Sequence, residues 1–128
     1  MAISAFVENL FKHLDFGWRR LSGEKFTLPI QQIVTQLLRE EIALGNALRI
    51  CFGTDSQVRG NQTDFATVIV FVREKKGAFM LIKGDREANP FNLRERMMYE
   101  VARSVEIAYY LSPIFEKFAI PVEIHVDI

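Results

Sequence analysis

Apolar residues recur at helical spacing in the first third of the chain. Residues 3–14 carry apolar side chains three and four positions apart, which is typical of one stripe along a helix. A second stripe consists of Ile30, Ile33, Val34, Leu37 and Leu38, and Gly45 and Asn46 follow it as a stop signal. Residues 1–46 are therefore predicted to form a helical segment with two helices before any strand.

From Ala47 onward the period changes to that of β-strands. Strands are predicted over residues 47–54, 65–73 and 78–83, with a tight turn at Lys75-Lys76-Gly77 between the last two. A polar loop over residues 84–90 should lead into a long helix from about Phe91 to about Phe118. A fourth strand is expected over residues 120–127.

This order of elements predicts a mixed α/β sheet. Three consecutive strands form an antiparallel meander, and the long helix crosses back to a fourth strand. A right-handed crossover would place that strand parallel to the first and beside it. The chain has 128 residues, which fits one domain over residues 1–128 with residues 47–128 forming the sheet and crossover helix.

Composition limits the possible settings without indicating a function. Hydrophobic residues make up 49% of the chain, and sixteen basic residues balance sixteen acidic ones. No global field therefore draws the protein to nucleic acid or to a membrane surface. The single cysteine, Cys51, cannot form an intramolecular disulfide and is expected to be a buried thiol. No apolar run approaches the roughly 18 residues of a membrane span, and no signal peptide is evident, so a cytoplasmic protein is expected.

Acidic residues follow the two strands that should be parallel neighbours. Asp55 comes at the predicted end of the first strand, and Asp127 ends the fourth. Ligand sites in α/β sheets gather at such carboxyl ends. Two carboxylates at the ends of adjacent strands lie close enough to repel each other unless a cation or a shared proton relieves the repulsion.

The long helix offers a third carboxylate. On a wheel of about 100° per residue, the predicted apolar face runs from Ile107 through Leu93, Met97, Val101 and Val105 to Ala102. Glu100 falls beside this face, next to Ser104, whereas Glu95 and Glu106 face water. Two aspartates and one glutamate suit Mg²⁺ or Mn²⁺, and paired ions of this kind promote phosphodiester cleavage. Each acid also has an ordinary interpretation, as a turn residue, a solvated helix residue or a residue near a terminus.

Other polar residues near this cluster are candidates for substrate contacts. Thr54, Ser56 and Gln57 could bind a phosphate or orient a water, although turn hydrogen bonds also account for them. Residues 59–103 include nine basic and six acidic residues. Arg59 and other basic residues of this stretch could contact backbone phosphates. His125 shares a strand face with Glu123 and Asp127, so it could belong to a metal site or simply lie at a sheet edge.

Three segments resemble a known family. They are residues 52–58 (FGTDSQV), residues 93–100 (LRERMMYE) and residues 124–128 (IHVDI). Together they resemble the YkuK-like group of predicted ribonuclease H-like nucleases, over roughly residues 47–128. The resemblance implies a ribonuclease H-like fold and a metal site of Asp55, Glu100 and Asp127, with Glu95 as a substitute for Glu100. It also implies RNA or an RNA–DNA hybrid as a partner.

One departure from that family supports a second hypothesis. Ribonuclease H-like domains usually continue past the fourth strand into another helix, which brings a further acid or histidine, whereas this sequence ends at Ile128. The alternative function is therefore a non-catalytic nucleic-acid-binding or assembly module. The segment near the start carries Phe6, Phe11, Phe16 and Trp18, which could then cover the sheet or meet a second subunit in a homo-oligomer.

Overall fold

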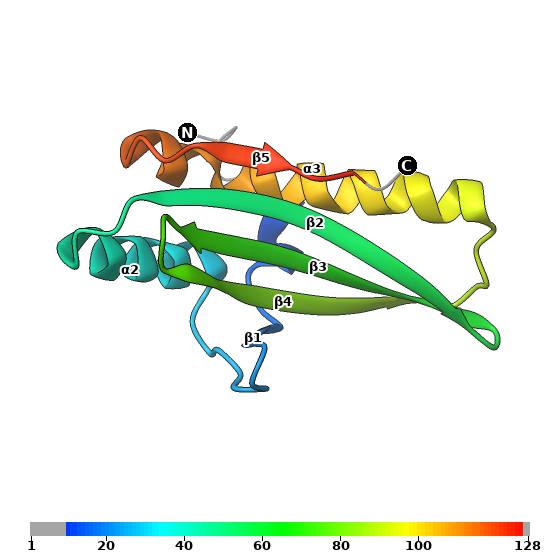
Figure 1. Ribbon diagram of the computed structural model, residues 1–128. Helices are drawn as coiled ribbons and strands as arrows, with labels where there is room; N and C mark the ends of the chain where they lie inside the picture. Colours follow the sequence, from blue (N-terminus) through cyan, green and yellow to red (C-terminus); the bar gives the residue numbers. More distant parts are fainter. Residues whose placement is uncertain (1–9, 127–128) are drawn as a thin grey trace.

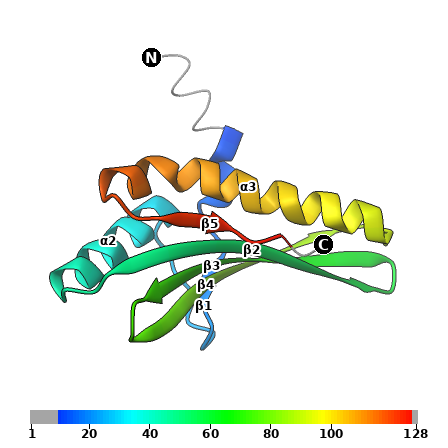
Figure 2. The same ribbon diagram turned by 45° about the horizontal axis from the view of Figure 1, so that its top comes forward.

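A mixed sheet with helices on one face makes up the part of the chain that the computed structural model describes, residues 10–126 (Figure 1). In chain order the elements are η1 (Lys12–Leu14), β1 (Trp18–Arg20), α2 (Ile30–Ala43), β2 (Leu48–Arg59), β3 (Gln62–Arg73), β4 (Gly77–Glu87), α3 (Leu93–Lys117) and β5 (Val122–Ile124). Figure 2 shows α2 and α3 on the same side of the sheet. No helix within residues 10–126 is long and apolar enough to cross a membrane.

The strand order is β1-β4-β3-β2-β5. β2, β3 and β4 form an antiparallel meander, and α3 crosses back so that β5 lies parallel to β2. The predicted mixed α/β sheet and its crossover are therefore confirmed. β1 pairs antiparallel with β4 and adds a fifth strand at the opposite edge.

The prediction of two helices before the sheet is wrong. Within residues 10–126 one α-helix, α2, precedes the long strands, and the three-residue strand β1 comes before it. Residues 3–9 of the predicted first helix lie outside the described residues; Leu10 and Phe11 are helical and lead directly into the short 3₁₀ helix η1. Trp18 explains the unexpected strand, because its side chain is 1% exposed and its indole N–H donates to the Leu14 carbonyl at 2.7 Å.

The long strands extend further than their apolar runs. β2 continues through Asp55 to Arg59, so Asp55 lies inside a strand, paired with Ala66, and does not end it. The β2–β3 hairpin turns at Gly60, whose φ of 60° favours glycine. β4 likewise runs to Glu87 through part of the predicted loop. The parts of β2 and β4 beyond the predicted strands, residues 55–59 and 84–87, are mostly polar. Hydrogen bonds to neighbouring strands hold them in strand conformation, and an apolar pattern does not reveal such bonds.

The core lies between the sheet and the two helices. Side chains at even positions of β2, such as Ile50 and Phe52, point toward the helices and are buried. Phe52 meets Phe115 of α3 with ring centroids 5.9 Å apart. The odd positions of β2 point to the opposite face, which no helix covers within residues 10–126 (Figure 2).

The buried face of α3 differs from the predicted one. Asn92 and Glu95 form a capping box that fixes the start of the helix. Leu93 and Val105 are 68% and 47% exposed, so the predicted apolar stripe is wrong in this half of the helix. The buried positions are Ser104, Ile107, Ala108, Leu111 and Phe115. Glu100 lies one turn before Ser104 and is half-buried, so it faces the sheet.

Truncation of Leu111 should measure how strongly α3 is held on the sheet. Leu111 is fully buried, so Leu111→Ala should lower the free energy of unfolding by about 2–5 kcal/mol. Val105→Ala on the exposed side of the same helix is the matched control and should change it by less than about 0.5 kcal/mol. Urea denaturation of both variants checks this, and equal losses would contradict the described packing.

Candidate functional site

The edge of β2 becomes free where β5 ends. β5 pairs with β2 only along Ile50–Phe52, and the last contact is the bond from the His125 amide to the Phe52 carbonyl at 2.8 Å. Beyond that point no strand within residues 10–126 pairs with this edge. Because backbone groups of alternate residues point to the same side of a strand, the amide and carbonyl of Ser56 point to this free edge.

Ser56 joins two of the predicted site residues. Its backbone amide donates to Asp55 Oδ1 at 2.9 Å, and its hydroxyl donates to a carboxylate oxygen of Glu100. Asp55 projects from the open face of the sheet, whereas Glu100 comes from α3 on the other face. Their carboxylates nevertheless bind the same residue, so both are brought to the free edge of β2.

Arg96 completes this cluster from the preceding turn of α3. Its Nε donates to Ser56 Oγ at 3.0 Å, and its Nη2 donates to the Ser56 carbonyl at 2.7 Å. The second bond satisfies a backbone carbonyl that a neighbouring strand would otherwise bind. Neither Asp55 nor Glu100 forms an ion pair with another residue in the range 10–126, which leaves two carboxylates beside one serine without a direct counterion.

Asp55 also lines two shallow hollows on the open face of the sheet. One, of about 410 Å³, includes Gly53, Val68 and His125, and the other, of about 200 Å³, includes Gln57 and Asp64. Asp55 and Ala66 line both hollows, and the Asp55 side chain is exposed between them. A ligand can therefore approach the Asp55 carboxylate from solvent.

The remaining predicted residues have different surroundings. Thr54 is turned toward α3, where its hydroxyl lies 2.7 Å from that of Ser104 and 3.3 Å from that of Thr67, so it forms part of a buried polar network. Gln57 and Arg59 lie on the exposed face and bind each other at 3.1 Å. Asp127 lies outside the described residues.

Two other glutamates of α3, both expected to face water, have structural partners. Glu95 caps α3 by accepting from the Asn92 amide at 3.1 Å, which accounts for its position without a ligand. Glu106 was expected to face water, but it binds His13 Nε2 at 2.5 Å. Glu100 is thus the α3 glutamate that reaches the edge of β2.

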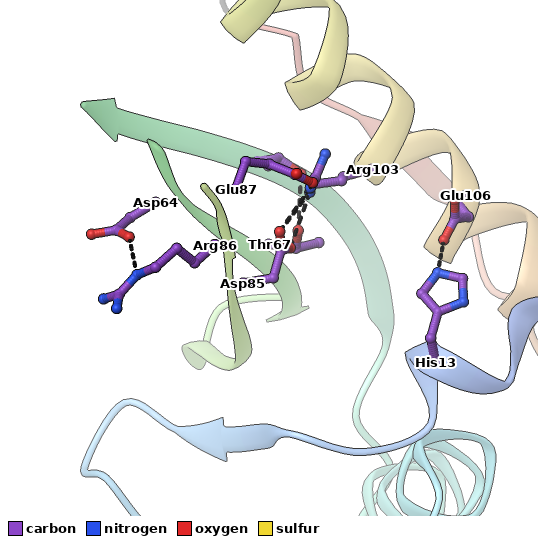
Figure 3. Close-up of polar contacts among 9 residues, drawn as sticks. His13, Asp64, Thr67, Asp85, Arg86, Glu87, Arg103 and Glu106 are labelled. Atoms are coloured by element: carbon purple, nitrogen blue, oxygen red, sulfur yellow. Dashed lines mark hydrogen bonds and ion pairs between the residues drawn. The ribbon is translucent and has the colours of Figure 1, made fainter. Parts of the chain in front are cut away.

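A second charged cluster lies on the helix side of β4, around a cavity of about 540 Å³ (Figure 3). Arg103 of α3 donates to both oxygens of Asp85 at 2.8–3.0 Å and to Glu87 at 2.9 Å. Partial burial lowers the pKa of Arg103, but its bonds to these two carboxylates outweigh that effect and shift the pKa upward. Its guanidinium also stacks over the Phe65 ring at 4.1 Å.

This cluster is not predicted from the sequence, because residues 84–90 lack the alternation of a half-buried strand and indicate a loop. In the structure the acids of the cluster already have partners: Arg103 binds Asp85 and Glu87, and His13 binds Glu106 (Figure 3). The cluster therefore has the features of a structural ion network, whereas the acids at Ser56 remain available to a cation.

Cys51, Glu123 and His125 meet on the open face beside the first hollow. Cys51 Sγ lies 3.9 Å from Glu123 Oε2, and His125 Nε2 lies 3.0 Å from the same oxygen. Burial raises the pKa of the Cys51 thiol, and the charge of Glu123 raises it further. The hydrogen bond with His125 lowers the pKa of the Glu123 carboxyl. The prediction that Cys51 is a buried thiol is therefore wrong: the residue is half-buried on the open face and has polar neighbours.

An antiparallel meander, a crossover helix and a parallel fourth strand, with carboxylates at the junction, define a mixed α/β domain with an acidic site at its sheet edge. The family model described as ribonuclease H-like matches residues 30–128. The chain belongs to the ribonuclease H-like family, which confirms the YkuK-like resemblance seen in the sequence. No curated protein and no solved structure matched the chain.

Removal of the Ser56 hydroxyl should test whether this serine holds the cluster together. Ser56→Ala deletes the bonds to Glu100 and Arg96, and should cost about 1–2 kcal/mol of unfolding free energy. Ser112→Ala is the control, since that hydroxyl bonds only the Tyr109 carbonyl within α3, and it should cost less than about 0.5 kcal/mol. Chemical denaturation measures both, and a neutral Ser56→Ala would show that the network contributes little.

Proposed function

We propose that this protein is a metal-dependent nuclease that hydrolyses phosphodiester bonds in nucleic acid. The observation that carries the proposal is the attachment of Asp55 and Glu100 to the same serine at the free edge of β2. Membership of the ribonuclease H-like family supports it independently. The matched residues, 30–128, include both Asp55 and Glu100.

The chemistry of the donors fits a hard divalent cation. Carboxylate oxygens are the ligands that Mg²⁺ and Mn²⁺ prefer, and Asp55 and Glu100 supply them from two sides of one strand. Asp127 is the third proposed ligand, since the sequence places it two residues after His125 of the strand beside β2. When bound, such an ion would supply Lewis acidity and an activated water for hydrolysis.

The protein's own groups have separate roles in this proposal. Arg96 holds the Ser56 carbonyl and hydroxyl, and so positions the segment of β2 that carries Asp55. Ser56 orients Glu100 through its hydroxyl. Gln57 and Arg59 lie on the same open face as Asp55 and are proposed to contact the phosphates of the substrate, for which a guanidinium is well suited. Thr54 supports the site from beneath through Ser104.

A non-catalytic assembly module is the second candidate, and one observation favours it. Val122, Ile124 and Val126 along the edge of the sheet are 40%, 40% and 47% exposed, which is unusual for apolar residues of a strand segment. Light scattering on dilute protein distinguishes the candidates in part. A stable oligomer without metal-dependent cleavage would support assembly as the function.

Cleavage of RNA, DNA and an RNA–DNA hybrid should require Mg²⁺ or Mn²⁺ and Asp55. Asp55→Asn removes one metal ligand charge and should lower the cleavage rate by about 100-fold or more, about 2.7 kcal/mol of transition-state stabilisation. Glu116→Gln is the control, because Glu116 is an exposed acid in the last turn of α3, outside the proposed site, and it should retain most activity. Absence of metal-dependent cleavage by the parent protein would overturn the proposal.

Metal should also stabilise the parent protein more than the Asp55→Asn variant. Asparagine can still accept the Ser56 amide bond, and it removes one like charge, so the metal-free variant should be at least as stable as the parent. An ion at about 100 times its dissociation constant stabilises the folded state by about 2.7 kcal/mol. Melting curves with and without Mg²⁺ measure this difference. Equal responses of the two proteins would mean that Asp55 binds no metal.

A further inference from the structure

We propose that Cys51, Glu123 and His125 form a second metal site, which takes a borderline-soft transition-metal ion of the Zn²⁺ class. The site lies on the open face of the sheet, at the pairing of β2 with β5. It does not depend on the proposed nuclease activity, because it uses different residues and a different class of ligand atom.

The backbone places these three residues together. Cys51 and Glu123 are directly paired in the parallel register of β2 and β5, so their side chains leave the same face of the sheet. His125 follows two residues after Glu123, and its amide is fixed to the Phe52 carbonyl at 2.8 Å. The three side chains therefore start from hydrogen-bonded strand positions and need no loop movement to meet.

The ligand atoms are already at nearly the spacing that a metal requires. The Cys51 sulfur, a Glu123 oxygen and a His125 nitrogen all lie within 4.8 Å of one another. The Sγ–Oε2 distance is 3.9 Å and the Nε2–Oε2 distance is 3.0 Å. Tetrahedral zinc with its usual bond lengths sets neighbouring ligand atoms roughly 3.4–3.6 Å apart. The two distances differ from this spacing by about half an ångström, and side-chain rotations that move the atoms by up to about 1.3 Å would bring the sulfur and the nitrogen to it.

The donor set selects the type of ion. A thiolate and an imidazole favour Zn²⁺ and related transition metals, whereas Mg²⁺ prefers oxygen ligands only. Arg49 lies 3.6 Å from Glu123 Oε1, which is the oxygen turned away from the other two ligands. The Arg49 guanidinium therefore leaves Glu123 Oε2 to the metal site, and its positive charge balances part of the negative charge of the ligands.

The site would keep one coordination position open. Three protein ligands with a fourth position for water or substrate is the arrangement of zinc sites that do chemistry, whereas structural sites are closed by four. His125 lines the hollow of about 410 Å³ that also includes Gly53 and Asp55, so this hollow would give a fourth ligand a path to an ion held by His125. A water or an anionic oxygen ligand is the class of molecule that such a position would bind.

Titration of the full chain with Co²⁺ tests the proposal, because cobalt occupies zinc sites and a cobalt–thiolate bond gives a charge-transfer absorption. One equivalent should bind with that absorption, and Zn²⁺ should displace it while excess Mg²⁺ should not. Cys51→Ser should abolish the absorption. Removal of a residue that only hydrogen-bonds to a metal ligand lowers metal affinity by about 10–100-fold. Removal of a ligand itself, in His125→Asn or Glu123→Gln, should therefore weaken cobalt binding by more than about tenfold.

The other histidine of the chain supplies the matched control. His13 is exposed and binds Glu106 on the helix side of the sheet, so His13→Asn should leave cobalt binding unchanged. Far-ultraviolet circular dichroism establishes that each variant is folded. Three results would overturn the proposal. The first is cobalt binding that does not saturate, and the second is cobalt binding without the thiolate absorption. The third is cobalt binding to folded His125→Asn that is as tight as binding to the parent protein.

Discussion

The alternation of side chains along β2 is the constraint on which the rest of the structure depends. Even positions such as Phe52 face α2 and α3 and build the core, whereas odd positions such as Cys51 and Asp55 face an uncovered surface. A shift of one residue in the register would exchange the two sets. Pairing with β3 along all of β2 and with β5 along part of it fixes that register. The early end of β5 then exposes the edge at Ser56.

Much of the fold could be predicted from the sequence because it rests on long periodic segments. The apolar runs of β2 and β3, the stripe of α2 and the length of α3 were sufficient to predict the meander and crossover. The outer halves of the strands were missed, since residues such as Asp64 and Arg86 are held there by pairing with a neighbouring strand and by their own ion pair at 2.9 Å. β1 was missed because three residues are too few to show a period.

The candidate site was only partly predictable for the same reason. Asp55 and Glu100 were both selected from the sequence, and both bind Ser56. The role of Ser56 and Arg96 as the link between them depends on which strand edge is free, and no local pattern reports that. Cys51 and Glu123 are likewise separated by most of the sheet region in sequence, so no short spacing could have indicated that they meet.

The central claim is that the free edge of β2 beyond β5 binds a divalent cation. Crystals grown with Mn²⁺ and measured at a wavelength where manganese scatters anomalously would locate the ion directly. An anomalous peak is expected within coordinating distance of carboxylate oxygens of Asp55 and Glu100, next to Ser56. A peak elsewhere, such as between Asp85 and Glu87, or no peak with the Ser56–Glu100 bond intact, would contradict it.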